Sequence, residues 1–206
     1  MIWLHFRVYP TNRFFEQLNL FFNFDHERNF PTYYNTILLF LCSLGFLFIA
    51  FTKAGEVIKL NYWLILSIVL LFLSIDDFLG LHEWLNIWIP RHFKIGGKGI
   101  FKFAWIIPYG LFSLAFGIYS IKNLLAINKS IAKGYLISGV LYVTGAILIE
   151  SASGLYYESI QDVFSFEYTL YFVTVEEFLE MFSLILVLYY QILHLKNLTT
   201  TTIEKV

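Results

Sequence analysis

Long apolar stretches, each sufficient to cross a lipid bilayer, constrain this chain more than any other feature of its sequence. A transmembrane helix needs about 20 consecutive, mostly apolar residues. Five stretches meet that requirement, at 33–52, 60–84, 101–121, 134–155 and 168–195. The sequence therefore predicts an all-α polytopic membrane helix bundle with five transmembrane helices. One membrane domain is expected over residues 1–195, with a flexible tail at 196–206.

The composition agrees with a protein that lies among membrane lipids. Hydrophobic residues make up 58% of the chain and charged residues 14%, whereas soluble domains average about 25% charged residues. Aromatic residues reach 20%, and such rings suit the membrane–water interface. The net charge of −1 argues against a nucleic-acid partner. The single cysteine, Cys42, excludes an intrachain disulfide and is expected to be a small core residue.

A short amphipathic segment, 12–24, precedes the first apolar stretch. Its apolar residues fall on one helical face; they are Phe14, Phe15, Leu18, Phe21 and Phe22. This pattern predicts a helix that lies in the membrane interface, or one that packs on the protein itself. Residues 1–10 lack the pattern of a cleavable signal peptide, so the first apolar span is expected to direct insertion. The expected location is the cell membrane.

The orientation in the membrane stays open at this point. Loops 53–59 and 122–133 carry five lysines, and the positive-inside rule favours a cytoplasmic position for such loops. The loop at 91–102 is also basic, although alternation of the spans places it on the opposite side.

Acidic residues inside the expected spans are the most unusual feature. They are Asp76, Asp77, Glu83, Glu150, Glu176, Glu177 and Glu180, and His82 accompanies them. A charge at the centre of a membrane helix costs on the order of 2.5–3.5 kcal/mol. Each acid alone could be a snorkelling end residue or a hydrogen-bonded link between helices. Together they must be protonated, reached by water or bound to cations.

Alternation of the spans places these acids at one membrane face. The end of span 60–84, the end of span 134–155 and the start of span 168–195 share that face. If span 60–84 is one helix, Asp76 and Glu83 lie on the same side of it, ~10 Å apart along its axis. Glu176 and Glu180 are one turn apart. The segment Asp25-His26-Glu27 reaches the same face.

Carboxylates with one imidazole suit hard or borderline divalent cations, such as Mn, Fe, Mg or Ca. The candidate metal ligands are Asp76, Glu83, Glu150, Glu176 and Glu180. The candidate catalytic residues are His82, Asp77 and Glu177. Asp25, His26 and Glu27 are secondary candidates. The leading hypothesis is a metal-dependent enzyme that acts on a lipid or another apolar substrate.

Two other functions fit the same residues. Intramembrane carboxylates also serve as proton relays, which fits a proton- or cation-coupled transporter or channel component. The acids could instead bind the basic helix of a partner in an accessory membrane subunit. An oligomer is compatible with each of these functions, and whether the chain is an enzyme stays open.

Several motifs resemble those of a family of uncharacterised bacterial multi-pass membrane proteins. They are Glu27-Arg28-Asn29-Phe30-Pro31-Thr32, Ser74-Ile75-Asp76-Asp77 with His82-Glu83, Trp105-Ile106-Ile107-Pro108-Tyr109-Gly110, and Glu176-Glu177-Phe178-Leu179-Glu180-Met181. The resemblance implies a bacterial inner membrane protein and implies no activity. Trp105 and Tyr109 are expected to be packing or interface residues. A fainter similarity links Asp25-His26-Glu27-Arg28-Asn29 to the acidic N-terminal segment of alkaline ceramidases, but the late histidine pair of those hydrolases is missing.

Overall fold

The computed structural model describes residues 21–22, 29–52, 60–159 and 169–203. These residues form helices α3 (Phe30–Ala50), α5 (Leu60–Leu79), α6 (Leu81–Phe93), α7 (Ile106–Leu124) and α8 (Lys129–Val143). Helix α8 continues through the π-helical segment η1 (Thr144–Ile149) into α9 (Glu150–Ser159). A second π-helical segment, η2 (Thr169–Val173), leads into α11 (Thr174–Ile203). The described ranges hold no strand beyond an isolated bridge between Lys98 and Phe101, so the all-α prediction is confirmed.

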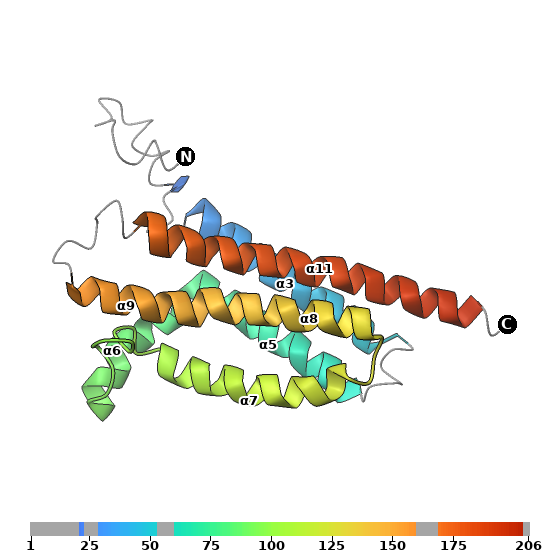
Figure 1. The fold of residues 1–206 in the computed structure, drawn as a ribbon, viewed down its shortest axis with the longest axis horizontal. Coiled ribbons are helices and arrows are strands. Elements are labelled where there is room, and N and C mark those ends of the chain that lie inside the picture. The colour runs from blue at the N-terminus through green and yellow to red at the C-terminus, as the bar shows by residue number, and fades with distance from the viewer. Residues whose placement is uncertain (1–20, 23–28, 53–59, 160–168, 204–206) are drawn as a thin grey trace, which may run out of the picture.

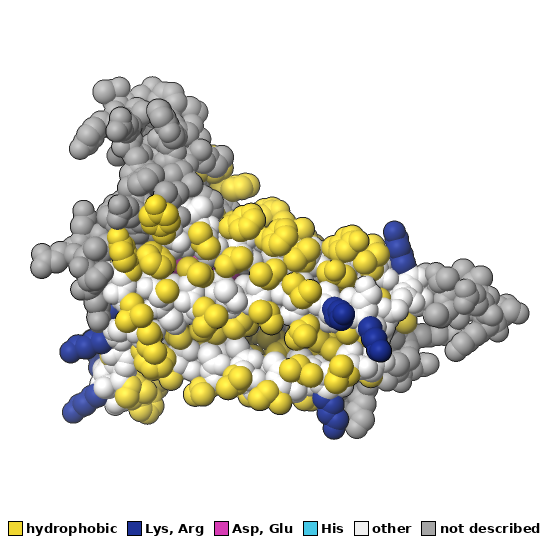
Figure 2. Space-filling model, in the orientation of Figure 1, with side chains coloured by type: hydrophobic (Ala, Val, Ile, Leu, Met, Phe, Trp, Pro, Cys, Tyr) yellow, Lys and Arg dark blue, Asp and Glu magenta, His cyan; other side chains and the backbone are white. Residues whose placement is uncertain are grey.

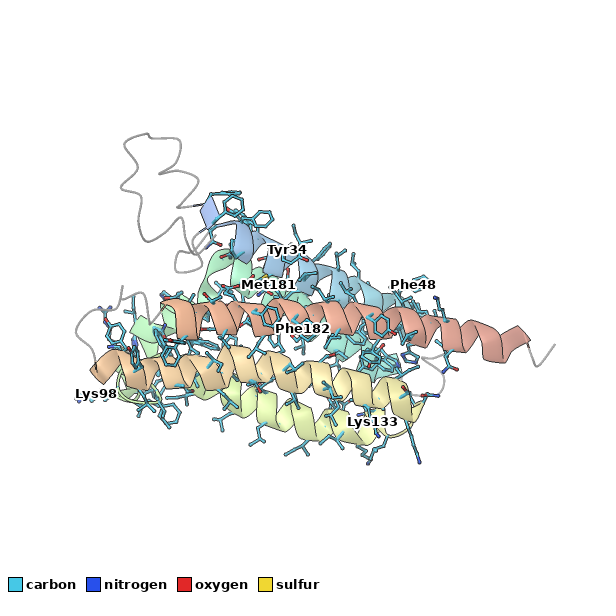
Figure 3. The ribbon with its side chains drawn as sticks, turned by 45° about the horizontal axis from the view of Figure 1, so that its top comes forward. Tyr34, Phe48, Lys98, Lys133, Met181 and Phe182 are labelled. Atoms are coloured by element: carbon cyan, nitrogen blue, oxygen red, sulfur yellow. The ribbon has the colours of Figure 1, made fainter. Side chains whose placement is uncertain are left out.

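The long helices lie side by side in an elongated bundle, and α6 bends away at one end (Figure 1). Helix α3 packs most extensively on α5, and α11 packs on both α8 and α3. The first turns of α3 and α11 and the last turns of α5 and α9 meet at the end that carries α6. We call this the α6 end. Lys98 lies at the α6 end and Lys133 at the other end (Figure 3).

Four helical stretches are long and apolar enough to cross a membrane: Phe30–Ala50, Tyr62–Leu79, Lys129–Tyr157 and Tyr171–Leu198. They indicate a membrane protein. Helix α7 has 19 residues and is not among these four, so the predicted count of five spans depends on this helix. Figure 2 shows hydrophobic side chains over the middle of the bundle, with Lys and Arg toward its two ends. Phe48, Leu114 and Ile192 are examples of such exposed apolar residues.

The prediction of one continuous helix over 60–84 is wrong. Helix α5 ends at Leu79, and Gly80 follows with a φ of 65°. A left-handed residue ends a helix, and glycine adopts this conformation without a Cβ penalty. Helix α6 then starts in a new direction at Leu81. Asp76 and Glu83 therefore belong to different helices and do not share a helical face.

Two other predictions from the sequence concern the ends of the chain. Helix α11 continues to Ile203, so residues 196–203 are helical, and the flexibility expected of this tail stays a prediction. Most of the predicted interfacial helix at 12–24 lies outside the described residues, as do Asp25, His26 and Glu27. Of that segment, Phe21 and Phe22 are described, and their rings pack against Phe30.

Hydrogen-bonding caps and buried rings fix the helices of the core. Asn29 caps α3 by accepting a hydrogen bond from the Thr32 amide at 2.9 Å, next to Pro31 in the first turn. An aromatic cluster fills the end opposite α6; its buried members include Tyr62, Trp63, Phe46 and Tyr135. Cys42 is fully buried beside Leu39 and Leu184, as expected for a core residue.

Candidate functional site

Both π-helical segments lie directly before acidic residues. Segment η1 ends at Ile149, so Glu150 is the first residue of α9, and η2 ends three residues before Glu176. Single π-helical turns insert an extra residue into a helix and often occur at functional sites. Here they set the direction in which Glu150 and Glu176 project.

Gly145 allows η1 and α11 to approach closely. A Cβ atom at this position would lie 3.0 Å from the Glu176 carbonyl oxygen and 3.1 Å from the Leu179 Cβ. Any larger residue would therefore push α11 away from η1. The glycine brings the backbone that carries Glu176 and Glu180 against the segment that leads to Glu150.

The side chains of Glu150, on α9, and Glu176, on α11, lie close enough to interact directly. Two ionised carboxylates only accept hydrogen bonds. A hydrogen bond between these two side chains would therefore need a proton on one of the two carboxyl groups. This pair therefore links α9 to α11.

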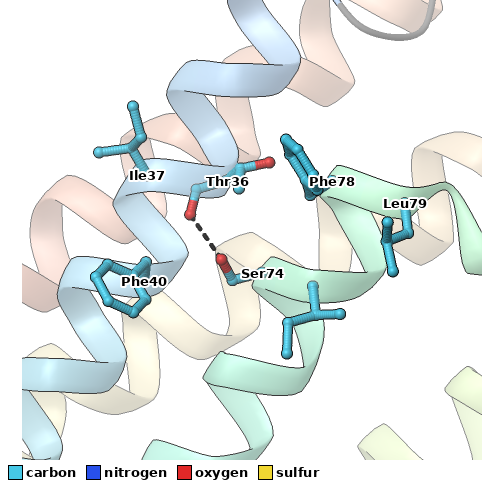
Figure 4. A pocket seen from close by; sticks show the side chains of 7 residues that line it. Thr36, Ile37, Phe40, Ser74, Phe78 and Leu79 are labelled. Atoms are coloured by element: carbon cyan, nitrogen blue, oxygen red, sulfur yellow. Dashed lines mark hydrogen bonds between the residues drawn. The ribbon is translucent and has the colours of Figure 1, made fainter.

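Neutral polar groups from α3 hold two other acids. Asn35 donates a hydrogen bond from Nδ2 to Glu180 Oε2 at 3.0 Å. Thr36 donates from Oγ1 to Asp77 Oδ2 at 2.7 Å. Ser74 in turn donates from Oγ to the Thr36 carbonyl at 2.9 Å (Figure 4). These bonds tie α3 to both α5 and α11 without any basic side chain.

The contacts of Asp76 mainly stabilise the start of helix α6. Its Oδ1 accepts a hydrogen bond from the His82 backbone amide at 2.8 Å, and its Oδ2 lies 3.3 Å from His82 Nδ1. Tyr109 also lies close to this carboxyl group. A carboxylate at the N-terminus of a helix satisfies free amides and favours the helix dipole. Asp76 thus caps α6 across the break at Gly80.

Two buried polar atoms of this region have no hydrogen-bond partner among the described residues. They are Trp105 Nε1 and Asn35 Oδ1. The side chains are 8% and 2% exposed. The Trp105 indole lies close to the Glu150 carboxyl group but makes no hydrogen bond of ordinary geometry with it. Buried polar atoms are usually satisfied, so a donor and an acceptor stay available to a bound molecule here.

The structure brings most of the predicted site residues to the α6 end. We call this group the acid site; it consists of Asp76, Asp77, His82, Glu150, Glu176, Glu177 and Glu180. Glu83 is exposed on α6 and lies within electrostatic reach of Glu150. Within the described ranges, no group of three or more His, Cys, Asp or Glu side chains is arranged to hold a metal ion.

Sequence reasoning missed the neutral residues that complete the acid site: Asn35, Thr36, Trp105, Tyr109 and Tyr142. Asn35 is an amide inside an apolar span, which is a usable signal. Trp105 and Tyr109 were expected to be packing residues, and their rings do pack on each other. Both also lie close to the acids, which was not expected. Tyr142 lies within electrostatic reach of Glu180, Asp77, Asp76 and Glu177, and nothing in its sequence neighbourhood indicates this.

A shallow apolar groove of about 360 Å³ runs between α3 and α5 beside the acid site (Figure 4). Its lining consists of Thr36, Ile37, Phe40, Ser74, Ile75, Phe78 and Leu79. Thr36 belongs both to this groove and to the hydrogen bond with Asp77. The groove therefore links the apolar outer surface of the bundle to one acid.

Comparison with known families gives one match. The profile of a family described as "Domain of unknown function (DUF8692)" matches residues 1–194. No curated protein and no solved structure matches the chain.

Proposed function

We propose, from the premise that this chain belongs to the DUF8692 family, that it binds and releases protons inside the membrane as a proton-coupled transporter or channel component. The family description states no activity, so the proposal rests on the acid site. Its strongest support is the close approach of Glu150 and Glu176 inside the bundle, because two carboxyl groups brought together in this way repel each other unless one of them carries a proton.

The surroundings of this pair also favour protons over a bound metal. Glu180 and Asp77 accept hydrogen bonds from an amide and a hydroxyl group, and Asp76 is engaged with His82 and Tyr109. A metal would have to replace these bonds to gather three ligands. Protonation of the acids removes the cost of burying their charge without any such change.

The proposal includes the finer topology. We place five spans in the membrane, with α7 as the additional one, so the chain is a multi-pass protein of the bacterial inner membrane. Helix α7 lies alongside the other spans in the bundle (Figure 1). The segment at 12–24 is proposed to lie in the interface at the α6 end.

A second candidate is an enzyme that acts on a lipid, and the α3–α5 groove supports it. An acyl chain in this groove would place the polar part of a lipid near Thr36 and Asp77. Asp77, Glu177 or His82 would then act as general acid or base. A divalent cation bound by Glu150, Glu176 and Glu180 belongs to this candidate.

Proton binding can be measured by infrared spectroscopy of the purified protein during a pH titration. The protonated carboxyl band should titrate in the parent protein. It should lose intensity in Glu150→Gln and in Glu176→Gln, because each change removes one member of the pair. Glu158→Gln, at the end of α9, is the matched control and should keep the band. The proposal fails if the two site variants and the parent titrate identically.

Metal analysis of the same preparations separates the two candidates. A stoichiometric divalent metal in the parent protein that is lost in Glu150→Gln and Glu176→Gln would favour the enzyme and contradict the proton site. Metal at background level in all preparations, with a titrating carboxyl band in the parent, is the result that we expect.

A further inference from the structure

A row of hydroxyl groups on α8 leads away from the acid site. Tyr142, Ser138 and Tyr135 are separated by four and three residues, so they lie on one face of the helix. Ser138 is fully buried, Tyr135 is 6% exposed, and α8 packs on α11. At a rise of 1.5 Å per residue, this row covers ~10 Å of the membrane thickness.

The first member of the row belongs to the acid site. Tyr142 lies within electrostatic reach of Glu180, Asp77, Asp76 and Glu177. Ser138 follows one turn earlier on α8, and its Oγ donates a hydrogen bond to the Gly134 carbonyl at 2.8 Å. That hydroxyl oxygen keeps its lone pairs as acceptors.

The last member contacts a buried histidine on α11. Tyr135 Oη lies 3.3 Å from His194 Nδ1, and both side chains are buried. The centroid of the Trp63 ring of α5 lies 5.2 Å from that of the His194 ring. Trp63 is fully buried, and its Nε1 has no hydrogen-bond partner within the described part of the chain. The other titratable groups near this pair are Tyr62 on α5 and Cys42 on α3, both within electrostatic reach of Tyr135.

We propose that Tyr142, Ser138, Tyr135 and His194 form a route for protons from the acid site to the opposite end of the bundle. This inference rests on the proposed proton-binding function. Tyrosine and serine hydroxyls donate and accept hydrogen bonds at once, and an imidazole ring can take up a proton at one nitrogen and release one from the other. Water molecules complete the route between the hydroxyl groups.

The transfer at the end of the route conserves protons. The Tyr135 hydroxyl gives its proton to the neutral Nδ1 of His194 and receives one from water on the Ser138 side. The resulting imidazolium releases a proton from Nε2 to the face beyond His194. Rotation of the imidazole ring, or movement of its remaining proton from Nδ1 to Nε2 through water, then resets His194 for the next proton, so no other reactant is consumed.

The test is proton flux into liposomes that contain the purified protein and an entrapped pH-sensitive dye, driven by a potassium diffusion potential. Tyr135→Phe keeps the ring and removes the relay hydroxyl, and His194→Gln keeps a polar side chain that cannot titrate. Each should lower the flux at least tenfold. Tyr189→Phe is the matched control, since Tyr189 is exposed on the outer surface of α11, and it should keep the parent flux.

The infrared titration of the carboxyl band distinguishes failure of the route from failure of the acid site. We expect Tyr135→Phe and His194→Gln to keep the band while they lose the flux. Parent-like flux in both variants would overturn the route and leave the acid site standing. A parent protein that titrates but passes no protons would also overturn the route. Ser138→Ala supplies a third variant if either of the first two fails to fold.

Discussion

At the residue scale, the acids of this protein are held by neutral groups and by each other. Asn35 and Thr36 donate to Glu180 and Asp77, and Glu150 pairs with Glu176. Neutral donors stabilise a carboxyl group in low-dielectric surroundings without fixing a permanent opposite charge beside it. Such a group can gain or lose a proton, whereas a close Lys or Arg would keep it ionised.

The contact at Gly145 gives a prediction at this scale. Gly145→Ala places a methyl group 3.0 Å from the Glu176 carbonyl oxygen, and overpacking of this kind costs about 1–3 kcal/mol. We expect a lower midpoint of thermal unfolding in detergent and a weaker titrating carboxyl band. The matched control is Gly139→Ala on α8, where a Cβ meets nothing within 4 Å.

Gly139→Ala should keep the parent midpoint or raise it slightly, because alanine favours the helix over glycine. Equal midpoints for Gly145→Ala and Gly139→Ala would show that η1 and α11 do not depend on this close approach.

The sequence identified the acids at this scale but not their partners. Charged residues in apolar spans stand out because their burial is costly, and this cost is a property of the residue itself. Asn35, Tyr109 and Tyr142 are ordinary residues until the fold places them beside an acid. Their role depends on which helix faces meet, and no local pattern records that.

At the scale of elements, the break between α5 and α6 defines the α6 end. Gly80 adopts a left-handed conformation, and Asp76 caps the new helix through the His82 amide. Apart from its acids and His82, the stretch 60–84 is largely apolar, so its hydropathy favours one long helix. The left-handed backbone conformation of Gly80 instead divides this stretch into two helices. The π-helical segments η1 and η2 also cannot be recognised from the sequence, because one inserted residue barely changes the pattern of apolar residues.

Gly80→Ala tests the break. A Cβ at Gly80 meets nothing within 4 Å, so the cost comes from the left-handed backbone alone, roughly 1–2 kcal/mol. We expect a lower unfolding midpoint in detergent. Gly110→Ala on α7 is the matched control, because its Cβ also meets nothing within 4 Å and its φ is not positive. A midpoint no lower than that of Gly110→Ala would contradict the role of Gly80.

At the scale of the whole molecule, the two ends of the bundle differ in chemistry. The α6 end holds the acid site, and the opposite end holds the aromatic cluster of Tyr62, Trp63 and Phe46. His194 and Tyr135 lie within this second end. Proton-binding side chains therefore lie toward both ends of the bundle, as a proton route across the membrane requires.

Cysteine labelling tests the arrangement of the spans. In a Cys42→Ala background, Lys98→Cys and Lys133→Cys place single thiols at the two exposed ends of the bundle (Figure 3). Helix α7 is the only long helix between these positions in the chain. If it crosses the membrane, a membrane-impermeant maleimide should label the two thiols from opposite sides.

Labelling of both thiols from one side would exclude α7 as a span and leave four. The parent protein, whose Cys42 is fully buried, is the control and should stay unlabelled from either side.

The sequence by itself determined that this chain is helical, that it carries stretches fit for a membrane and that its acids are out of place there. These properties follow from the free energy of moving each residue from water into lipid, which is nearly additive along the chain. The tertiary structure decided which acids pair, where α5 ends and which tyrosines and amides face the site. Those outcomes depend on one backbone dihedral at Gly80 and one close approach at Gly145, and such geometry exists only once the helices have packed.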